Sequence, residues 1–214
     1  MANLKGILFL VLLPALLSCH TPPVSLKDVT KEYKHKDYER LFEMWTQHGE
    51  VYNLDTLENS LKVSATYLSW EMRQAYVARY ANDYGFDATR KMEMLKKERA
   101  EFESHMEFVV AATATKQRWV EFHKEDNPWQ ITLITSQGVE IFPSGVERVK
   151  KPSAMLMAYF SYITIYREVY RFFFPFLDSS TGKPVLTPDL GYFSLVFAGA
   201  LGRVELKWKV KKDD

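Results

Sequence analysis

Cysteine is nearly absent from the 214-residue chain, in which Cys19 is the only one. A small secreted domain that is held together by disulfides needs an even number of cysteines. A single cysteine excludes any disulfide within the chain, so the packing of apolar side chains has to stabilise the fold. Aromatic residues make up 14% of the chain, which is enough for a sizeable core and unlike a disordered composition.

An excess of either charge is also lacking. The chain has 28 Lys and Arg residues against 27 Asp and Glu residues, and Lys5 is the only charged residue among the first 18. Residues 19–214 therefore carry equal numbers of basic and acidic side chains, 27 of each. Because proteins that bind nucleic acid usually carry a basic excess or a basic stripe, we expect no nucleic-acid partner.

No apolar run is long enough to cross a membrane as a helix. The longest lies near the N-terminus, covers residues 7–17, and is interrupted only by Pro14. Since a membrane-spanning helix needs about 20 residues, a run of this length behind a single Lys5 is typical of an export signal. We therefore predict a signal peptide over residues 1–18.

The end of this signal is its most specific part. The sequence Leu16-Leu17-Ser18-Cys19 resembles the lipobox of bacterial lipoproteins. The resemblance implies cleavage before Cys19, a diacylglyceryl group on its sulfur, and further acylation, for example by palmitate. Several acyl chains give stable anchoring. The alternatives are an ordinary cleaved signal or an uncleaved short anchor. In bacteria with two membranes, the resemblance implies that a residue other than Asp after the cysteine, here His20, favours the outer membrane.

The next segments are predicted to lead into the folded domain. Residues 19–30 carry the lipidated cysteine and two prolines, which favour an extended tether. Residues 31–50 are predicted to form an N-terminal helix, and Gly49 is its expected stop. The apolar stripe of this helix has the spacing i, i+3, i+4, i+7 and consists of Tyr38, Leu41, Phe42 and Trp45.

Residues 51–214 are predicted to form an antiparallel β-sandwich of immunoglobulin-like appearance, which makes the fold class α+β. Alternating segments spaced 8–15 residues apart indicate the strands, and the clearest are 61–67, 108–115, 193–197 and 204–210. A helical hairpin is predicted at about residues 70–104, with Gly85 ending its first helix and Asp87 capping its second. In the last strand, Val204, Leu206 and Trp208 should face inward.

Recognisable catalytic and metal-binding motifs are missing from the sequence. There is no Gly-x-Ser-x-Gly elbow, no nucleotide-binding glycine loop, and no free thiol once Cys19 is modified. None of the five histidines has the spacing of a metal-ligand pair, and His123 beside Glu121, Glu125 and Asp126 is the nearest approach to a ligand cluster. We therefore expect no catalytic residue, no metal and no cofactor.

One stretch is unusually rich in aromatic residues, from Tyr159 to Phe176. The simpler interpretation is a sandwich core with strands buried on both faces. The functional alternative is a partner or ligand surface, because tyrosine combines an apolar ring with a polar hydroxyl and is common at partly solvated binding surfaces. Its candidate residues are Tyr159, Tyr162, Tyr166 and Tyr170.

These observations favour a lipid-anchored protein of the cell envelope that acts as a non-enzymatic binding or structural module. Its expected partners are the membrane, through the N-terminal lipid, and another envelope protein. The periplasmic face of the outer membrane is the expected location. The alternative is a ligand-binding or hydrolytic domain that uses an aromatic cleft.

Overall fold

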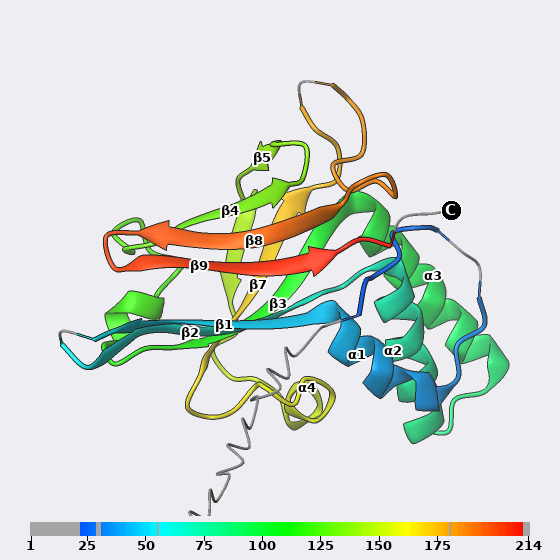
Figure 1. The fold of residues 1–214 in the computed structure, drawn as a ribbon. Helices are drawn as coiled ribbons and strands as arrows, with labels where there is room; N and C mark the ends of the chain where they lie inside the picture. Colours follow the sequence, from blue (N-terminus) through cyan, green and yellow to red (C-terminus); the bar gives the residue numbers. More distant parts are fainter. Residues whose placement is uncertain (1–21, 29–30, 55, 180, 212–214) are drawn as a thin grey trace, which may run out of the picture.

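Two antiparallel sheets pack face to face in the computed structural model, which describes residues 22–28, 31–54, 56–179 and 181–211 (Figure 1). One sheet has the strand order β1-β2-β3-β7-β6 and the other has the order β5-β4-β8-β9. The strands are β1 (Thr46–Asn53), β2 (Glu58–Tyr67), β3 (His105–Thr113), β4 (Gln130–Thr135), β5 (Glu140–Ile141), β6 (Gly145–Arg148), β7 (Glu168–Pro175), β8 (Tyr192–Gly199) and β9 (Gly202–Lys209). The predicted α+β sandwich is confirmed, and its immunoglobulin-like character stays an analogy.

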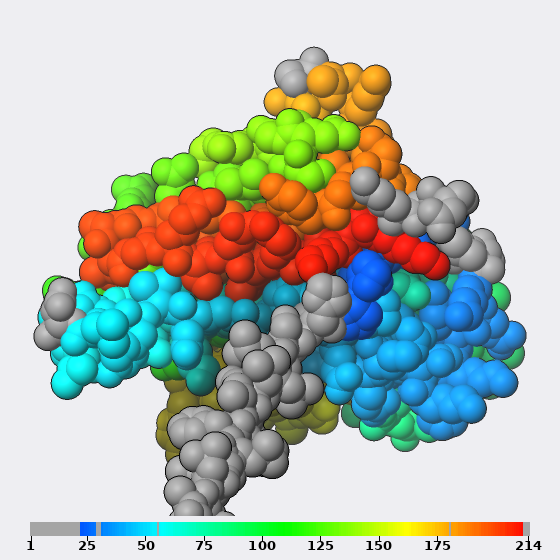
Figure 2. All heavy atoms as spheres, viewed as in Figure 1, coloured from blue at the N-terminus to red at the C-terminus, as the bar shows by residue number. Residues whose placement is uncertain are grey.

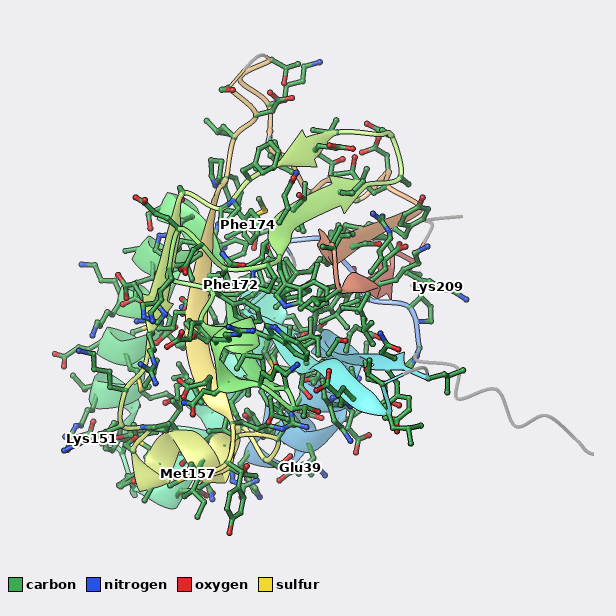
Figure 3. The ribbon with its side chains drawn as sticks, turned by 90° about the vertical axis from the view of Figure 1, so that its left-hand side faces the viewer. Glu39, Lys151, Met157, Phe172, Phe174 and Lys209 are labelled. Carbon is green, nitrogen blue, oxygen red and sulfur yellow. The ribbon has the colours of Figure 1, made fainter. Side chains whose placement is uncertain are left out.

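Aromatic side chains fill the space between the sheets. Trp208 is 1% exposed, stacks on Phe193 with ring centroids 5.2 Å apart, and lies 5.6 Å from Phe108. Its indole N–H donates to the backbone oxygen of Trp45 at 3.0 Å. Figure 3 shows Phe172 and Phe174 pointing into the same interior. The alternation predicted for the last two strands is confirmed, because a period of two places every second side chain of β8 and β9 in this core.

The predicted helical hairpin is inserted between β2 and β3. It consists of α2 (Trp70–Asp83) and α3 (Ala88–Ser104). The Ser69 hydroxyl caps α2 by accepting from the amide of Met72, and Asp87 caps α3 by accepting from the amide of Arg90. Gly85 has a φ of 62°, the left-handed conformation that suits glycine after a helix.

The N-terminal helix is shorter than predicted. A 3₁₀ turn, η1 (His35–Asp37), leads into α1 (Tyr38–Trp45), after which the chain enters β1. Gly49 is therefore a strand residue, and its prediction as a helix stop is wrong. The physical reason is the end of the apolar stripe at Trp45: the following residues pair with β2 instead, and Gly49 lies directly against Val204 and Leu206 of β9.

The described part of the expected tether is docked on the domain. Val24 is 1% exposed and forms a parallel bridge to Val210, just beyond β9. Asp28 accepts hydrogen bonds from both terminal nitrogens of Arg99 at 2.9 and 2.6 Å. Apolar burial and a charged clamp therefore fix residues 24–28 to the domain, so these residues are not part of a free tether.

The aromatic-rich stretch divides into two different structures. Its second part is β7, as expected. Its first part starts at the last residue of the short helix α4 (Ala154–Tyr159) and continues as turns, so the prediction of strands buried on both faces is wrong there. This part covers the outer face of the five-stranded sheet, where the Tyr162 hydroxyl donates to the backbone oxygen of Val109 at 2.8 Å. Another short turn, η2 (Gln117–Val120), precedes β4.

Candidate functional site

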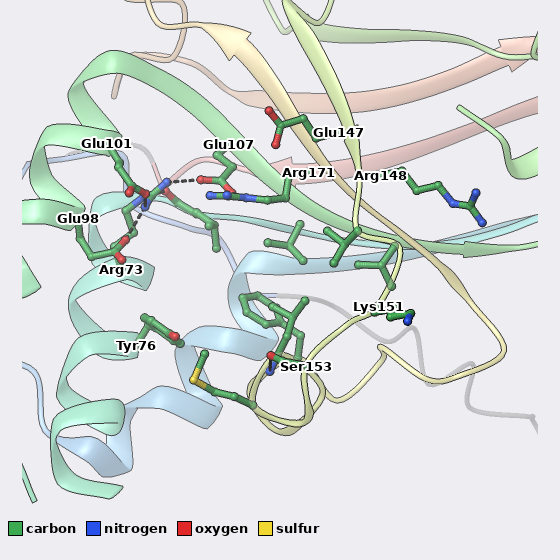
Figure 4. A pocket seen from close by; sticks show the side chains of 17 residues that line it. Arg73, Tyr76, Glu98, Glu101, Glu107, Glu147, Arg148, Lys151, Ser153 and Arg171 are labelled. Atoms are coloured by element: carbon green, nitrogen blue, oxygen red, sulfur yellow. Dashed lines mark hydrogen bonds and ion pairs between the residues drawn. The ribbon is translucent and has the colours of Figure 1, made fainter. Parts of the chain in front are cut away.

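A cleft of about 550 Å³ opens on the outer face of the five-stranded sheet (Figure 4). Helices α2 and α3 form one wall, β3, β7 and β6 form the floor, and α4 forms the opposite wall. The volume lies in the range of sites that bind small molecules or single side chains of a partner. The apolar lining consists of Leu68, Val109, Val149, Met155, Leu156, Phe160 and Val169.

Strand alternation explains which side chains reach this floor. Phe108 points into the core, so its neighbours Glu107 and Val109 point outward into the cleft. The register places Val109 opposite Arg171, and Arg171 opposite Glu147 on the next strand. One row across the sheet therefore presents apolar, basic and acidic side chains in turn.

A buried ion-pair network closes one end of the cleft. The Glu107 side chain is fully buried, and each of its oxygens accepts from a different arginine. Arg73 Nη2 donates to Oε2 at 2.6 Å, and Arg171 Nε donates to Oε1 at 2.5 Å. Because both oxygens are occupied, the charge of this buried carboxylate is fully compensated.

Arg73 connects the network to the helical hairpin. Its side chain is buried, and its Nη1 donates to Glu98 of α3 at 2.5 Å. Burial opposes the charge of Arg73, but Glu107 and Glu98 outweigh that cost and raise its pKa. Burial also raises the pKa of Glu98, and Arg73 compensates only part of this shift. The network thus fixes α2, α3, β3 and β7 against one another.

Three charged groups of the cleft are open to a ligand. Arg171 is about two-fifths exposed and uses only Nε towards Glu107. Within the described part of the chain, Lys151 and Glu147 have no hydrogen-bond or ion-pair partner, although both line the cleft. An apolar surface flanked by available groups of both charges suits a bound polypeptide segment better than a single strongly charged ligand.

The four predicted tyrosines do not form one surface. Tyr159, Tyr162 and Tyr170 are buried, and only Tyr166 is exposed, at 83%. Two of the three buried hydroxyls donate to backbone oxygens: Tyr162 to that of Val109 and Tyr170 to that of Val120, the latter at 2.7 Å. Tyr159 donates to Asp83 at 3.0 Å. Three of the four are therefore core residues, and their rings are not available to a partner.

A second polar cluster lies at the other end of this sheet face. His48 Nδ1 and Ser64 Oγ are 2.8 Å apart, and Arg167 donates to the same Ser64 oxygen at 2.8 Å. Burial, together with the nearby charges of Arg167 and Lys62, lowers the pKa of His48. Ser64 is 2% exposed, so this hydroxyl ties β1, β2 and the Arg167 loop together and is not placed to attack a substrate.

The lipidation residue Cys19 lies outside the described residues. Among the residues that the structure does describe, no group of three His, Cys, Asp or Glu side chains is arranged to hold a metal ion. The same residues include no helix that is long and apolar enough to span a membrane.

Sequence reasoning missed the arginines and the glutamate of the buried network. The available signal was a single charge inside an otherwise apolar segment, as for Glu107 between Met106 and Phe108, and Arg171 between Tyr170 and Phe172. Burying a charge is unfavourable unless it is paired, so the sequence could have predicted an ion pair at both positions. The pairing itself was not visible, because Arg73, Glu107 and Arg171 are more than 30 residues apart along the chain.

Comparison with protein-family models, with curated proteins and with solved structures finds no match to this chain. The protein is therefore described by its own structure: an α+β sandwich with a cleft that has helices as walls.

Proposed function

We propose that this protein is a lipid-anchored, non-enzymatic binding module of the bacterial cell envelope, and that its cleft holds a segment of a partner protein. The anchor is the acylated Cys19, inferred from the lipobox-like sequence. The partner is another envelope protein, met at the periplasmic face of the outer membrane in a cell with two membranes.

The observation that carries the binding role is the composition of the cleft. Its helical wall and its floor present apolar side chains beside Arg171, Lys151 and Glu147, which keep free hydrogen-bonding capacity. The most buried acid, Glu107, already holds two arginines. A general acid or base has to exchange a proton with its substrate, and a carboxylate that is saturated by arginines is poorly suited to that task. The arrangement therefore favours binding over hydrolysis.

The partner role can be tested with two exposed methionines, one inside the cleft and one outside it. Met155 of α4 lines the cleft and is exposed, and Met92 of α3 is exposed but does not line it. In a pull-down from detergent-solubilised membranes, Met155→Asp should lose a partner that wild type and Met92→Asp both retain. A partner retained equally by all three proteins contradicts the proposed site.

A small-molecule ligand is the second candidate, because a volume of about 550 Å³ falls in the usual range for such sites. Native mass spectrometry of protein purified from membranes separates the two cases. A discrete added mass that Met155→Asp lacks would identify a ligand, whereas a protein partner lost from the same variant would identify the module proposed above.

A further inference from the structure

The first described residues are bound to the domain beside the end of β9. The amide of Val24 donates to the backbone oxygen of Lys209 at 2.8 Å, and the amide of Lys211 donates back to Val24 at 2.8 Å. Figure 2 shows the dark blue atoms of this segment against the red atoms of the C-terminal strand. The point where the anchor chain joins the domain is therefore fixed.

The chain between that point and the lipid is short. Four residues lie between Cys19 and Val24, and the five steps from one Cα to the next span at most about 18 Å when fully extended. An acyl chain on Cys19 therefore holds the Val24 corner of the domain close to the lipid headgroups. A free tether over residues 19–30 would have allowed any orientation, but the docking of residues 24–28 restricts it.

Two exposed lysines lie at this corner of the domain. Alternation along β9 places Trp208 and Val210 inside, so the side chains of Lys209 and Lys211 point outward on either side of the Val24 bridge. Neither lysine has an ion-pair partner among the described residues. Lys207 lies on the same face, although it is paired with Glu205 at 2.9 Å.

The geometry points to a membrane-contacting surface: we propose that Lys209 and Lys211 rest on anionic lipid headgroups and that the cleft faces away from the bilayer. Figure 3 places Lys209 and Lys151 on opposite sides of the molecule, and Lys151 belongs to the cleft. The occupant is a lipid surface because the short anchor brings one there and the exposed charge is positive. The inference rests on the proposed acylation of Cys19.

Lysine footprinting of the full acylated protein tests this orientation. The protein is added to preformed vesicles of phosphatidylcholine, with or without phosphatidylglycerol, and acetylation of each lysine is followed by mass spectrometry. On the anionic vesicles, Lys209 and Lys211 should react at least about fivefold more slowly than on neutral ones, and Lys151 should be unchanged. In about 1 M salt the difference should disappear while the protein stays bound, because headgroup contacts are screened and acyl insertion is not.

Equal reactivity of Lys209 and Lys211 on both kinds of vesicle would overturn the contact with headgroups and leave these lysines as protection of an edge strand. Slower reaction of Lys151 instead would reverse the orientation. A failure of the anchor is seen separately, since unacylated protein does not float with vesicles of either composition and its intact mass carries no acyl chains.

Discussion

At the scale of single residues, the molecule separates side chains that stabilise the core from those available to a partner. Trp208 and the Glu107 network belong to the first group, because they are buried and their polar atoms are bonded internally. Met155 and Lys151 belong to the second group, because they line an open cleft. Whether a side chain is buried and has its polar atoms paired decides which group it belongs to, more than its residue type does.

Trp208 should be the most sensitive of the core residues. Removing its ring in Trp208→Ala leaves a cavity against Phe193 and Phe108, which typically costs about 3–5 kcal/mol. The exposed neighbour Lys209→Ala should change stability by less than about 0.5 kcal/mol. Denaturant unfolding of both purified variants measures the difference. If Trp208→Ala unfolds like wild type, Trp208 is not part of the core.

His48 should make stability depend on pH. Its folded-state pKa lies below the ordinary 6.5, so the unfolded chain takes up a proton first as pH falls. Stability from this residue is therefore complete above about pH 7 and declines as the pH falls from about 6.5 through the lowered pKa. His48→Asn should show a smaller loss of urea midpoint between pH 7.5 and pH 5.5 than wild type. His35→Asn, at an exposed position outside the sheet, is the control, and an equal loss in all three proteins would contradict the assignment.

At the scale of elements, the sequence predicted those segments whose periodicity is long and whose ends are marked. The α2–α3 hairpin was predicted with its helix end at Gly85 and its helix cap at Asp87, and the structure confirms both. Strand β1 was missed because its residues are mostly polar and half-exposed, which gives no clear alternation. Helix α4 was missed because six residues carry too little periodicity to distinguish a helix from a strand.

Gly49 tests the close approach of β1 to β9. A Cβ at this position would lie 2.4 Å from Val204 Cγ2 and 2.9 Å from Leu206 Cδ2. Gly49→Ala should therefore cost about 1–3 kcal/mol through overpacking. Adding Val204→Ala removes one clashing group, so the double variant should be more stable than the sum of the single changes predicts. Strictly additive free energies of unfolding would show that the two strands do not touch here.

At the scale of the whole molecule, the docked N-terminal segment and the cleft belong to one body, in which Lys209 and Lys151 lie on opposite sides (Figure 3). The sandwich and its helical insertion were predictable, because each follows from local patterns that agree with one another. The cleft was not predictable, since it is assembled from α2, α3, α4 and three strands that are distant in the sequence. Only the three-dimensional arrangement brings Arg73, Glu107 and Arg171 together.

The anchor has its own prediction. Cys19→Ser removes the only thiol that acylation can use, so the variant should accumulate as unprocessed precursor or appear in the soluble fraction. Membrane fractionation together with the intact mass of the product measures both outcomes. A variant that fractionates with membranes as wild type does, without precursor, would contradict the lipoprotein assignment.

The most direct measurement of the central claim is photocrosslinking in living cells from within the cleft. A benzophenone amino acid is placed at Met155 in one protein and at Met92 in the control, which positions the probe on α4 inside the cleft or on α3 outside it. A discrete crosslinked protein adduct is expected from position 155 and not from position 92. Adducts of equal yield from both positions, or an adduct from position 92 alone, would show that the cleft is not where this protein binds its partner.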